Sequence, residues 1–315
     1  MAAINNSAKK KFQKKLGKTL LVTAIYFVVF QVVALVASVF LLIGNNSAVK
    51  NMLPSAIEQS GVPYFWAIGV GLLVIVAVSP PRLRRQYWIA GKEQISWKKF
   101  FSLTAILMTL QIVAGIYGAL FEKLVNLIGF SATQQLEAAT HSSQSFSMLL
   151  YAALLGPLTE EIVFRGYLLR SLAKYGNEMA IIISAYMFGL YHANFVQTPP
   201  FAFMVGLVFG YVALNYGIKW SIGLHIFNNF VLGDFLTFVL RRLAPARADQ
   251  LSGIIILGGG IIGAYILARN WSKLRMWWAA NREGRHYLRT AFGSKYLLII
   301  TLIVVGLACL GLTRV

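Results

Sequence analysis

The stretch LLGPLTEEIVFRGYLLR, residues 154–170, combines the apolar composition of a membrane helix with three charged side chains near its middle. The charged residues are Glu160, Glu161 and Arg165. Ionised groups at membrane depth are costly, and they occur mainly where they pair with one another or serve a function. This stretch therefore indicates the fold class through its apolar length and a candidate functional site through its charges.

The composition of the whole chain indicates a polytopic membrane protein. The chain has 315 residues, of which 58% are hydrophobic and only 12% charged. The hydrophobic residues occur in runs close to the length that spans a bilayer, so we predict an all-α transmembrane helical bundle of about eight or nine spans. The candidate spans are residues 19–43, 62–79, 100–121, 145–170, 179–196, 200–216, 221–240, 253–268 and 295–312.

Three regions follow from this arrangement. Residues 1–144 hold a basic N-terminal segment and three spans, and residues 145–240 hold four spans with the intramembrane polar residues. Residues 241–315 hold the last two spans, and the first of these, which contains three consecutive glycines, is expected to bend or to pack closely on a neighbour. Residues 122–144 are expected to be an outer connector.

The net charge of +19 indicates how the chain lies in the membrane. The basic residues flank the apolar runs, which disfavours nucleic-acid binding and is typical of membrane topology and of contact with anionic lipids. We predict a multi-pass protein of the cell membrane, a bacterial plasma membrane, with its N-terminus in the cytoplasm. The Trp-rich basic segment 269–292 would then lie at the inner surface, whereas Arg241, Arg242 and Arg247 fit this orientation poorly. The sequence leaves the oligomeric state open.

Helix geometry separates the three charges of the opening stretch. Glu161 and Arg165 are four residues apart with the acid first, so they share a helix face in the favourable order for an ion pair. Glu160 points about 100° away and has no partner on its own helix. A lone intramembrane acid is a functional candidate, and the alternative is a structural cluster that holds helices together.

Two later spans carry further polar side chains. His192 has Phe188 four residues before it, and His225 has Asn229 four residues after it and Asn228 three residues after it. Side chains at these spacings share a helix face. Each could be a structural hydrogen-bonding residue between helices. With a rise of about 1.5 Å per residue, however, the polar groups of all three spans can meet in one inward-opening cavity.

These residue types suit the hydrolysis of a carbonyl compound such as a peptide bond. A carboxylate and an imidazole can together deprotonate water, while a second imidazole and an amide can donate hydrogen bonds to an oxyanion. No cofactor is needed for this chemistry. The alternative is a zinc site formed by Glu160, His192 and His225, which ranks second because the sequence has no H-E-x-x-H motif.

Three short patterns over residues 150–235 together resemble a known protein family. The patterns are E-E-x-x-x-R (Glu160, Glu161, Arg165), F-x-x-x-H (Phe188, His192) and H-x-x-x-N (His225, Asn229). In this order they resemble the type II CAAX prenyl endopeptidase and bacteriocin-processing family, also called the CPBP or Abi family. The resemblance implies an intramembrane endopeptidase whose site opens to the cytosol and which acts on a peptide or membrane-associated protein.

The resemblance also implies roles for the residues. Glu160 and His192 would activate water. His225 and Asn229 would form the oxyanion hole, although the spacing only favours Asn229 over Asn228. The supporting residues would be Glu161, Arg165 and Phe188.

Bacterial members of the family suggest peptide processing, bacteriocin self-immunity or a scaffold role, so a non-catalytic immunity or scaffold protein remains an alternative. A proton-coupled transporter with Glu160, His192 and Asp234 as its relay is a weaker alternative, because no duplicated half with broken helices is visible.

Overall fold

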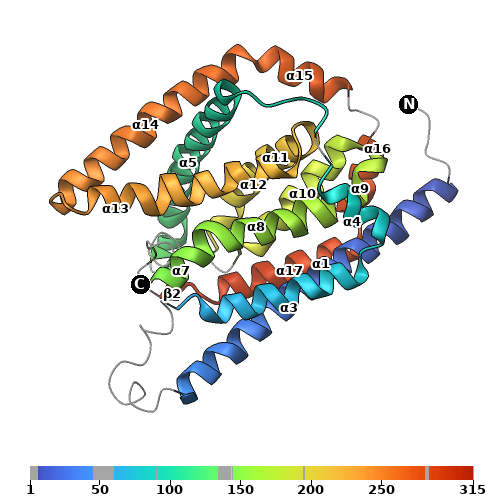
Figure 1. Ribbon diagram of the computed structural model, residues 1–315, viewed down its shortest axis with the longest axis horizontal. Helices are drawn as coiled ribbons and strands as arrows, with labels where there is room; N and C mark the ends of the chain where they lie inside the picture. The colour runs from blue at the N-terminus through green and yellow to red at the C-terminus, as the bar shows by residue number, and fades with distance from the viewer. Residues whose placement is uncertain are drawn as a thin grey trace.

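The computed structural model describes residues 6–44, 60–89, 91–133, 143, 145–193, 196–280 and 284–314. Over these residues the chain is an all-α polytopic bundle, as the composition predicts (Figure 1). The longer single helices are α1 (Asn6–Gly44), α3 (Val62–Val78), α5 (Trp97–Asn126), α10 (Asn177–Tyr191), α11 (Thr198–Asn215), α14 (Pro245–Arg269) and α17 (Lys295–Cys309). The shorter elements are α4 (Pro81–Tyr87), α15 (Trp271–Ala280), α16 (Arg285–Phe292) and the paired strands β1 (Phe130–Ser131) and β2 (Thr313–Arg314). Of the predicted connector 122–144, residues 122–126 form the end of α5 and residues 130–131 form β1, while 134–142 and 144 lie outside the described residues.

Two continuous helices change their winding along their length. The first consists of α7 (Phe146–Leu150), η1 (Tyr151–Leu155), α8 (Gly156–Glu161), η2 (Ile162–Leu169), α9 (Arg170–Leu172) and η3 (Ala173–Tyr175). The second consists of α12 (Ile218–Ile226), η4 (Phe227–Phe235) and α13 (Leu236–Leu240). The segments η1, η2 and η4 are π-helical, and π-helical turns are frequent at functional sites. They occur in the two helices that carry Glu160 and His225.

The chain is a multi-pass membrane protein. Within the described residues, six helices are long and apolar enough to cross a bilayer, and α16 with α17, bent by 55°, would make a seventh. Each of the nine predicted spans contains a helix, but α3 and α10 have only 17 and 15 residues. The predicted fold class is therefore confirmed, whereas a count of eight or nine complete spans stays a prediction.

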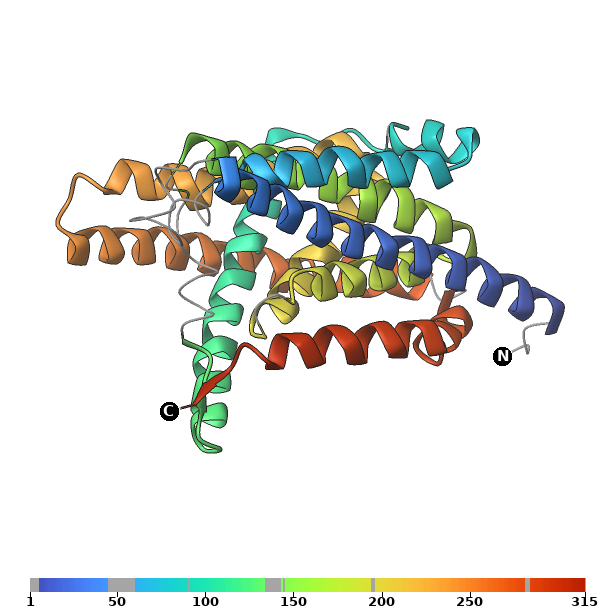
Figure 2. The same cartoon turned by 90° about the horizontal axis from the view of Figure 1, so that it is seen from below.

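The two ends of the bundle differ in charge. Figures 1 and 2 place the start of α1 together with α4, α9 and α16 at one end, and the turn between α13 and α14 at the opposite end. The helices at the first end are rich in basic residues, among them Lys14, Lys18, Arg84, Arg85, Lys174 and Arg289. The orientation with this end in the cytoplasm stays a prediction.

Helix α14 packs closely on α5 through its glycines. A Cβ atom built on Gly259 would lie 2.0 Å from Met108 Sδ, and one on Gly263 would lie 2.0 Å from the Ala105 carbonyl oxygen. Thr109 of α5 also donates a 2.8 Å hydrogen bond to the Gly260 carbonyl. Small residues allow such close helix approach in membranes. Because α14 is one continuous helix, close packing and not a bend explains the glycine run.

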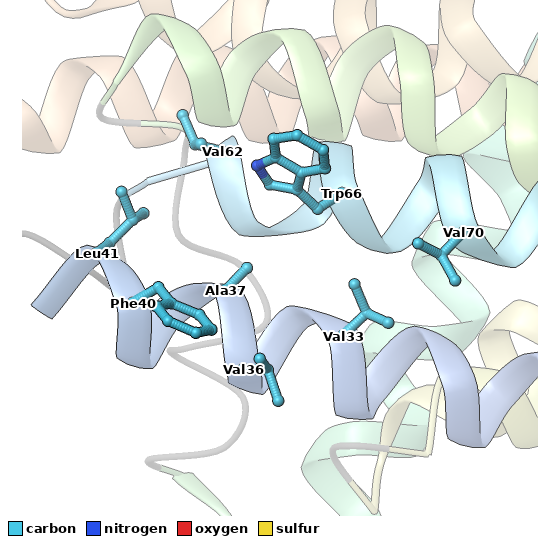
Figure 3. Close-up of a pocket in the computed structure, with 8 residues that line it drawn as sticks. All are labelled: Val33, Val36, Ala37, Phe40, Leu41, Val62, Trp66 and Val70. Atoms are coloured by element: carbon cyan, nitrogen blue, oxygen red, sulfur yellow. The ribbon is translucent and has the colours of Figure 1, made fainter. Parts of the chain in front are cut away.

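The structure has an apolar groove of about 420 Å³ between the C-terminal half of α1 and the start of α3 (Figure 3). Its lining consists of Val33, Val36, Ala37, Phe40, Leu41, Val62, Trp66 and Val70. Such a lining suits lipid acyl chains, and none of the candidate catalytic residues contributes to it. The polar site lies instead among α8, α10 and α12, which pack between the α1–α3 pair and the α5–α14 pair (Figure 1).

Candidate active site

The ion pair between Glu161 and Arg165 anchors the site. Arg165 Nη1 lies 3.0 Å from Glu161 Oε1, and both side chains are fully buried. Arg165 Nη2 also donates to the Gly206 carbonyl oxygen at 3.2 Å, and its guanidinium lies over the Phe188 ring at 4.3 Å from the centroid. The ion pair predicted from helix spacing therefore forms, and the arginine additionally joins η2 to α10 and α11.

Glu161 has two further partners on α12. Ser221 Oγ lies 2.6 Å from Glu161 Oε2 and 2.9 Å from the Phe209 carbonyl oxygen. His225 Nδ1 lies 3.1 Å from Glu161 Oε1. A buried carboxylate needs such partners to offset its lost hydration. Glu161 therefore contacts the His225 ring directly through Oε1, and its Oε2 accepts from Ser221, a serine that the sequence reading missed. Its supporting role stays a prediction.

Glu160 faces both histidines. Its Oε2 lies 3.9 Å from His192 Nε2 and 3.7 Å from His225 Nε2. The Glu160 and His225 side chains are 11% and 4% exposed, and that of His192 is 33% exposed. Three separate helical segments thus bring these groups together. Both separations exceed the usual hydrogen-bond range of about 2.7–3.2 Å, so the acid stands opposite the imidazoles without a direct bond.

The hydrogen-bond partner of Nδ1 in each histidine indicates which of the two ring nitrogens carries a proton in the neutral form. His192 Nδ1 lies 2.9 Å from the Phe188 carbonyl oxygen. A carbonyl oxygen can only accept, so Nδ1 carries a proton, and in the neutral ring the Nε2 lone pair faces Glu160. By the same argument His225 Nδ1 donates to the Glu161 carboxylate. His225 Nε2 is consequently a donor only when the ring carries a second proton.

Aromatic rings fix the orientation of both imidazoles. The Phe188 and His192 ring centroids are 4.4 Å apart, so Phe188 contacts both Arg165 and His192. Phe209 of α11 stacks on His225 at 4.5 Å with an interplanar angle of 25°. Sequence reasoning missed Phe209, because one phenylalanine in an apolar helix carries no distinguishing signal. Ser221 could have been found, since it lies four residues before His225 on the same face.

The structure corrects the position of His192 within its span. The predicted span 179–196 placed His192 inside a helix, but α10 ends at Tyr191 and His192 is the residue that follows. Its backbone N–H donates to the Gly189 carbonyl, and its own carbonyl accepts from the Thr198 hydroxyl. His192 therefore sits in the turn that leads to α11, which leaves its side chain partly exposed.

Asn229 has its hydrogen bonds elsewhere than at the histidines. Its Nδ2 donates to the Ala152 carbonyl of η1 at 3.2 Å, and its Oδ1 accepts from Asn228 Nδ2 at 3.1 Å. Over the described part of the chain, no hydrogen bond joins Asn229 to Glu160 or to either imidazole. The π-helical winding of η4 begins at Phe227, between His225 and Asn229, so α-helical spacing does not fix their relative direction. Asn229 nevertheless borders the helix that carries Glu160.

Three tyrosines surround Glu160. The carboxylate lies within electrostatic range of the hydroxyls of Tyr26, Tyr151 and Tyr191, which come from α1, η1 and α10. Tyr26 is fully buried. The sequence reading found no motif in the first span, because tyrosine is common in membrane helices and the contact with Glu160 is tertiary.

The alternative zinc ligands do not match a tetrahedral site. With zinc–ligand bonds of about 2.0–2.1 Å, neighbouring ligand atoms lie about 3.4 Å apart, whereas the two distances from Glu160 are 3.7 and 3.9 Å. Among the described residues, no group of three His, Cys, Asp or Glu side chains is arranged to hold a metal ion. The geometry of these three residues is wider than zinc requires.

Two other polar residues of the spans are engaged elsewhere. Ser184 donates its hydroxyl to the Phe164 carbonyl oxygen at 2.8 Å, which does not suit a nucleophile. Asp234 Oδ1 accepts a 2.8 Å hydrogen bond from the backbone N–H of Ser143. Asp234 therefore caps a connecting segment, and no ion pair or hydrogen bond within the described ranges links it to Glu160.

Comparison with known proteins identifies the segment that carries this site. Residues 142–231 match a family model described as type II CAAX prenyl endopeptidase Rce1-like. No curated protein and no solved structure matches the chain. The matched segment contains Glu160, His192, His225 and Asn229. Residues 142–231 are therefore similar to the Rce1-like proteases, which supports the CPBP/Abi-type resemblance that the motifs indicate.

Proposed function

We propose that the protein is a membrane-embedded endopeptidase that cleaves a peptide or membrane-associated protein with water activated by Glu160 and His192. The observation that supports this proposal most is the position of Glu160 Oε2 opposite the Nε2 atoms of two histidines, at 3.9 and 3.7 Å. Polar groups separated by this distance are commonly bridged by a water molecule. A water between Glu160 and His192 would donate one proton to the carboxylate and the other to the Nε2 lone pair.

The reaction then follows from the protonation states. The water oxygen bonds to the scissile carbonyl carbon while one O–H bond breaks and its proton passes to the Glu160–His192 pair. Collapse of the tetrahedral intermediate breaks the C–N bond, and the pair returns the proton to the leaving amine. Phe188 supports this step because its carbonyl holds the Nδ1 proton of His192 and so keeps Nε2 available as the base.

The developing oxyanion needs hydrogen-bond donors. We propose His225 and Asn229 for this role. His225 would donate through Nε2 in its doubly protonated form, with Nδ1 held by Glu161. Asn229 has two N–H groups on Nδ2, and the one that does not face Ala152 would point at the substrate.

The orientation and surroundings of the protein belong to the same proposal. We place the N-terminus of a cell-membrane protein in the cytoplasm, with the basic end of the bundle against anionic lipids. The site would then be reached from the cytoplasmic side, through the exposed edge of His192. Peptide processing and bacteriocin self-immunity are the biological roles that fit such a position.

The test of this function is cleavage by the purified protein in lipid vesicles. A library of membrane-associated peptides would be incubated with wild type, with His192→Ala and with His286→Ala as the control, since His286 lies on α16 away from the site. Cleavage that His192→Ala abolishes and His286→Ala preserves supports the proposal. The non-catalytic immunity or scaffold alternative holds if two results coincide. Wild type cleaves no peptide, and the Glu160→Gln variant still protects cells against a bacteriocin. Proton flux that depends on Glu160 would instead favour a transporter.

A further inference from the structure

Gln111 lies on α5, outside the matched segment, yet it is joined to the candidate site by a chain of hydrogen bonds. Gln111 Nε2 donates to Asn228 Oδ1 at 3.3 Å. Asn228 Nδ2 donates to Asn229 Oδ1 at 3.1 Å, and Asn229 Nδ2 donates to the Ala152 carbonyl oxygen at 3.2 Å. The chain thus runs from α5 through η4 to η1, the segment that precedes Glu160 on its helix.

The Ala152 carbonyl, at one end of this series of hydrogen bonds, determines which group donates in each of them. The Ala152 carbonyl oxygen is only an acceptor, so Asn229 must present its amide nitrogen there. Asn229 Oδ1 then faces Asn228, which must present its own nitrogen. Asn228 Oδ1 in turn faces α5, where only a donor can satisfy it. A glutamine at position 111 supplies that donor.

Close packing holds Gln111 at this place. Thr109 and Ile112 are its near neighbours on α5: Thr109 donates to the Gly260 carbonyl at 2.8 Å, and a Cβ on Gly260 would lie 2.2 Å from Ile112 Cδ1. The α5–α14 contact therefore fixes the rotation of α5 about its axis. The side chain of Gln111 is half-buried and faces η4.

We infer that Gln111 is a positioning residue for Asn229, and this inference rests on the proposed function, in which Asn229 donates to the oxyanion. The Ala152 carbonyl sets the orientation of the Asn229 amide from one end of the network, and Gln111 holds the Asn228 amide in the matching orientation from the other end. The second N–H of Asn229 is thereby aimed before the substrate arrives. Donors that are oriented in advance are the ones that stabilise a transition state most, and removal of one such donor costs about 10²–10³ in kcat.

Two substitutions separate positioning from packing. Gln111→Leu removes the donor and leaves Asn228 Oδ1 without a partner. Gln111→Glu keeps the shape, but its ionised carboxylate is an acceptor and would turn the Asn228 amide around. A purely structural role for Gln111 would leave Gln111→Glu closer to wild type than Gln111→Leu. Thr109→Val is the matched control, because it removes a hydrogen bond from the same stretch of α5 that does not reach the asparagines.

The experiment measures kcat and KM for a cleaved peptide together with the melting temperature in detergent. We expect about a tenfold fall in kcat for both Gln111 variants with KM within about twofold, because the donor acts on the transition state. Thr109→Val should keep the wild-type kcat. In an Asn228→Leu background, Gln111→Leu should cause no further loss, since residues in one network are not additive.

The outcomes separate this inference from the function on which it rests. Wild-type kcat in both Gln111 variants, or a full additional loss in the Asn228→Leu background, overturns the positioning role while leaving the peptidase intact. If Gln111→Leu does not fold, the isosteric Gln111→Glu decides alone. Absence of cleavage by wild type overturns the proposed function and this inference together.

Discussion

Glu160 and His192 face one another across the boundary between α8 and the end of α10, with Glu160 Oε2 3.9 Å from His192 Nε2. The carbonyl of Phe188 holds the other imidazole nitrogen, so the lone pair of Nε2 is directed at the acid. Among the described residues, Glu160 forms no ion pair with an arginine or lysine comparable to that of Glu161 with Arg165. The two adjacent glutamates consequently have different roles, one as the centre of a buried network and one as the candidate base.

The first prediction concerns metal dependence. Because the distances from Glu160 to the two histidines are wider than a tetrahedral zinc site requires, we expect peptide cleavage to persist in a strong chelator. The measurement is the cleavage rate after dialysis against the chelator, with and without added zinc. Loss of activity that zinc alone restores would favour the zinc alternative with Glu160, His192 and His225 as ligands.

The second prediction concerns the buried ion pair. Arg165→Met leaves Glu161 buried without its cation, and breaking a buried pair in this way costs about 3–5 kcal/mol. We expect a large fall in the melting temperature measured in detergent. Arg241→Met is the control, because Arg241 is exposed and lies over the Phe238 ring at 4.0 Å. Equal melting temperatures for the two variants would show that the Glu161 network does not stabilise the fold.

The third prediction concerns the glycines of α14. A Cβ on Gly263 would lie 2.0 Å from the Ala105 carbonyl oxygen, whereas one on Gly258 would meet nothing within 4 Å. Gly263→Ala should therefore destabilise the protein by about 1–3 kcal/mol through overpacking, and Gly258→Ala should not. Thermal unfolding of the two variants measures the difference. Indistinguishable unfolding curves would mean that α14 does not pack on α5 at this distance.

The fourth prediction concerns orientation. The substitution Lys10→Cys is made in a Cys309→Ser background. The new thiol should react with a membrane-impermeant reagent only after intact cells are permeabilised. A cysteine at Arg242, in the turn at the opposite end of the bundle, should react without permeabilisation. The physical reason is the asymmetry of basic residues between the two ends. The reverse labelling pattern would place the site on the outer side.

The sequence predicted those parts of the site that depend on spacing within one helix. The Glu161–Arg165 pair followed from i,i+4 geometry, and the polar residues of separate spans indicated that Glu160 and the histidines could meet. Sequence periodicity does not show where one helix contacts another, so Phe209 and Gln111 were not found. The π-helical winding of η4 also has no clear sequence pattern, which is why the direction of Asn229 could not be derived.

The most direct test of the central claim compares Glu160→Gln with Asp234→Asn. Both substitutions neutralise an acid within a membrane helix, but Asp234 accepts a hydrogen bond from the backbone N–H of Ser143 and has no role in the proposed mechanism. The measurement is kcat for one identified peptide. We predict that Glu160→Gln lowers kcat by at least about 100-fold, as expected for loss of a general base. The kcat of Asp234→Asn should stay within about threefold of wild type. Equal kcat values for the two variants would contradict the assignment of Glu160 as the general base.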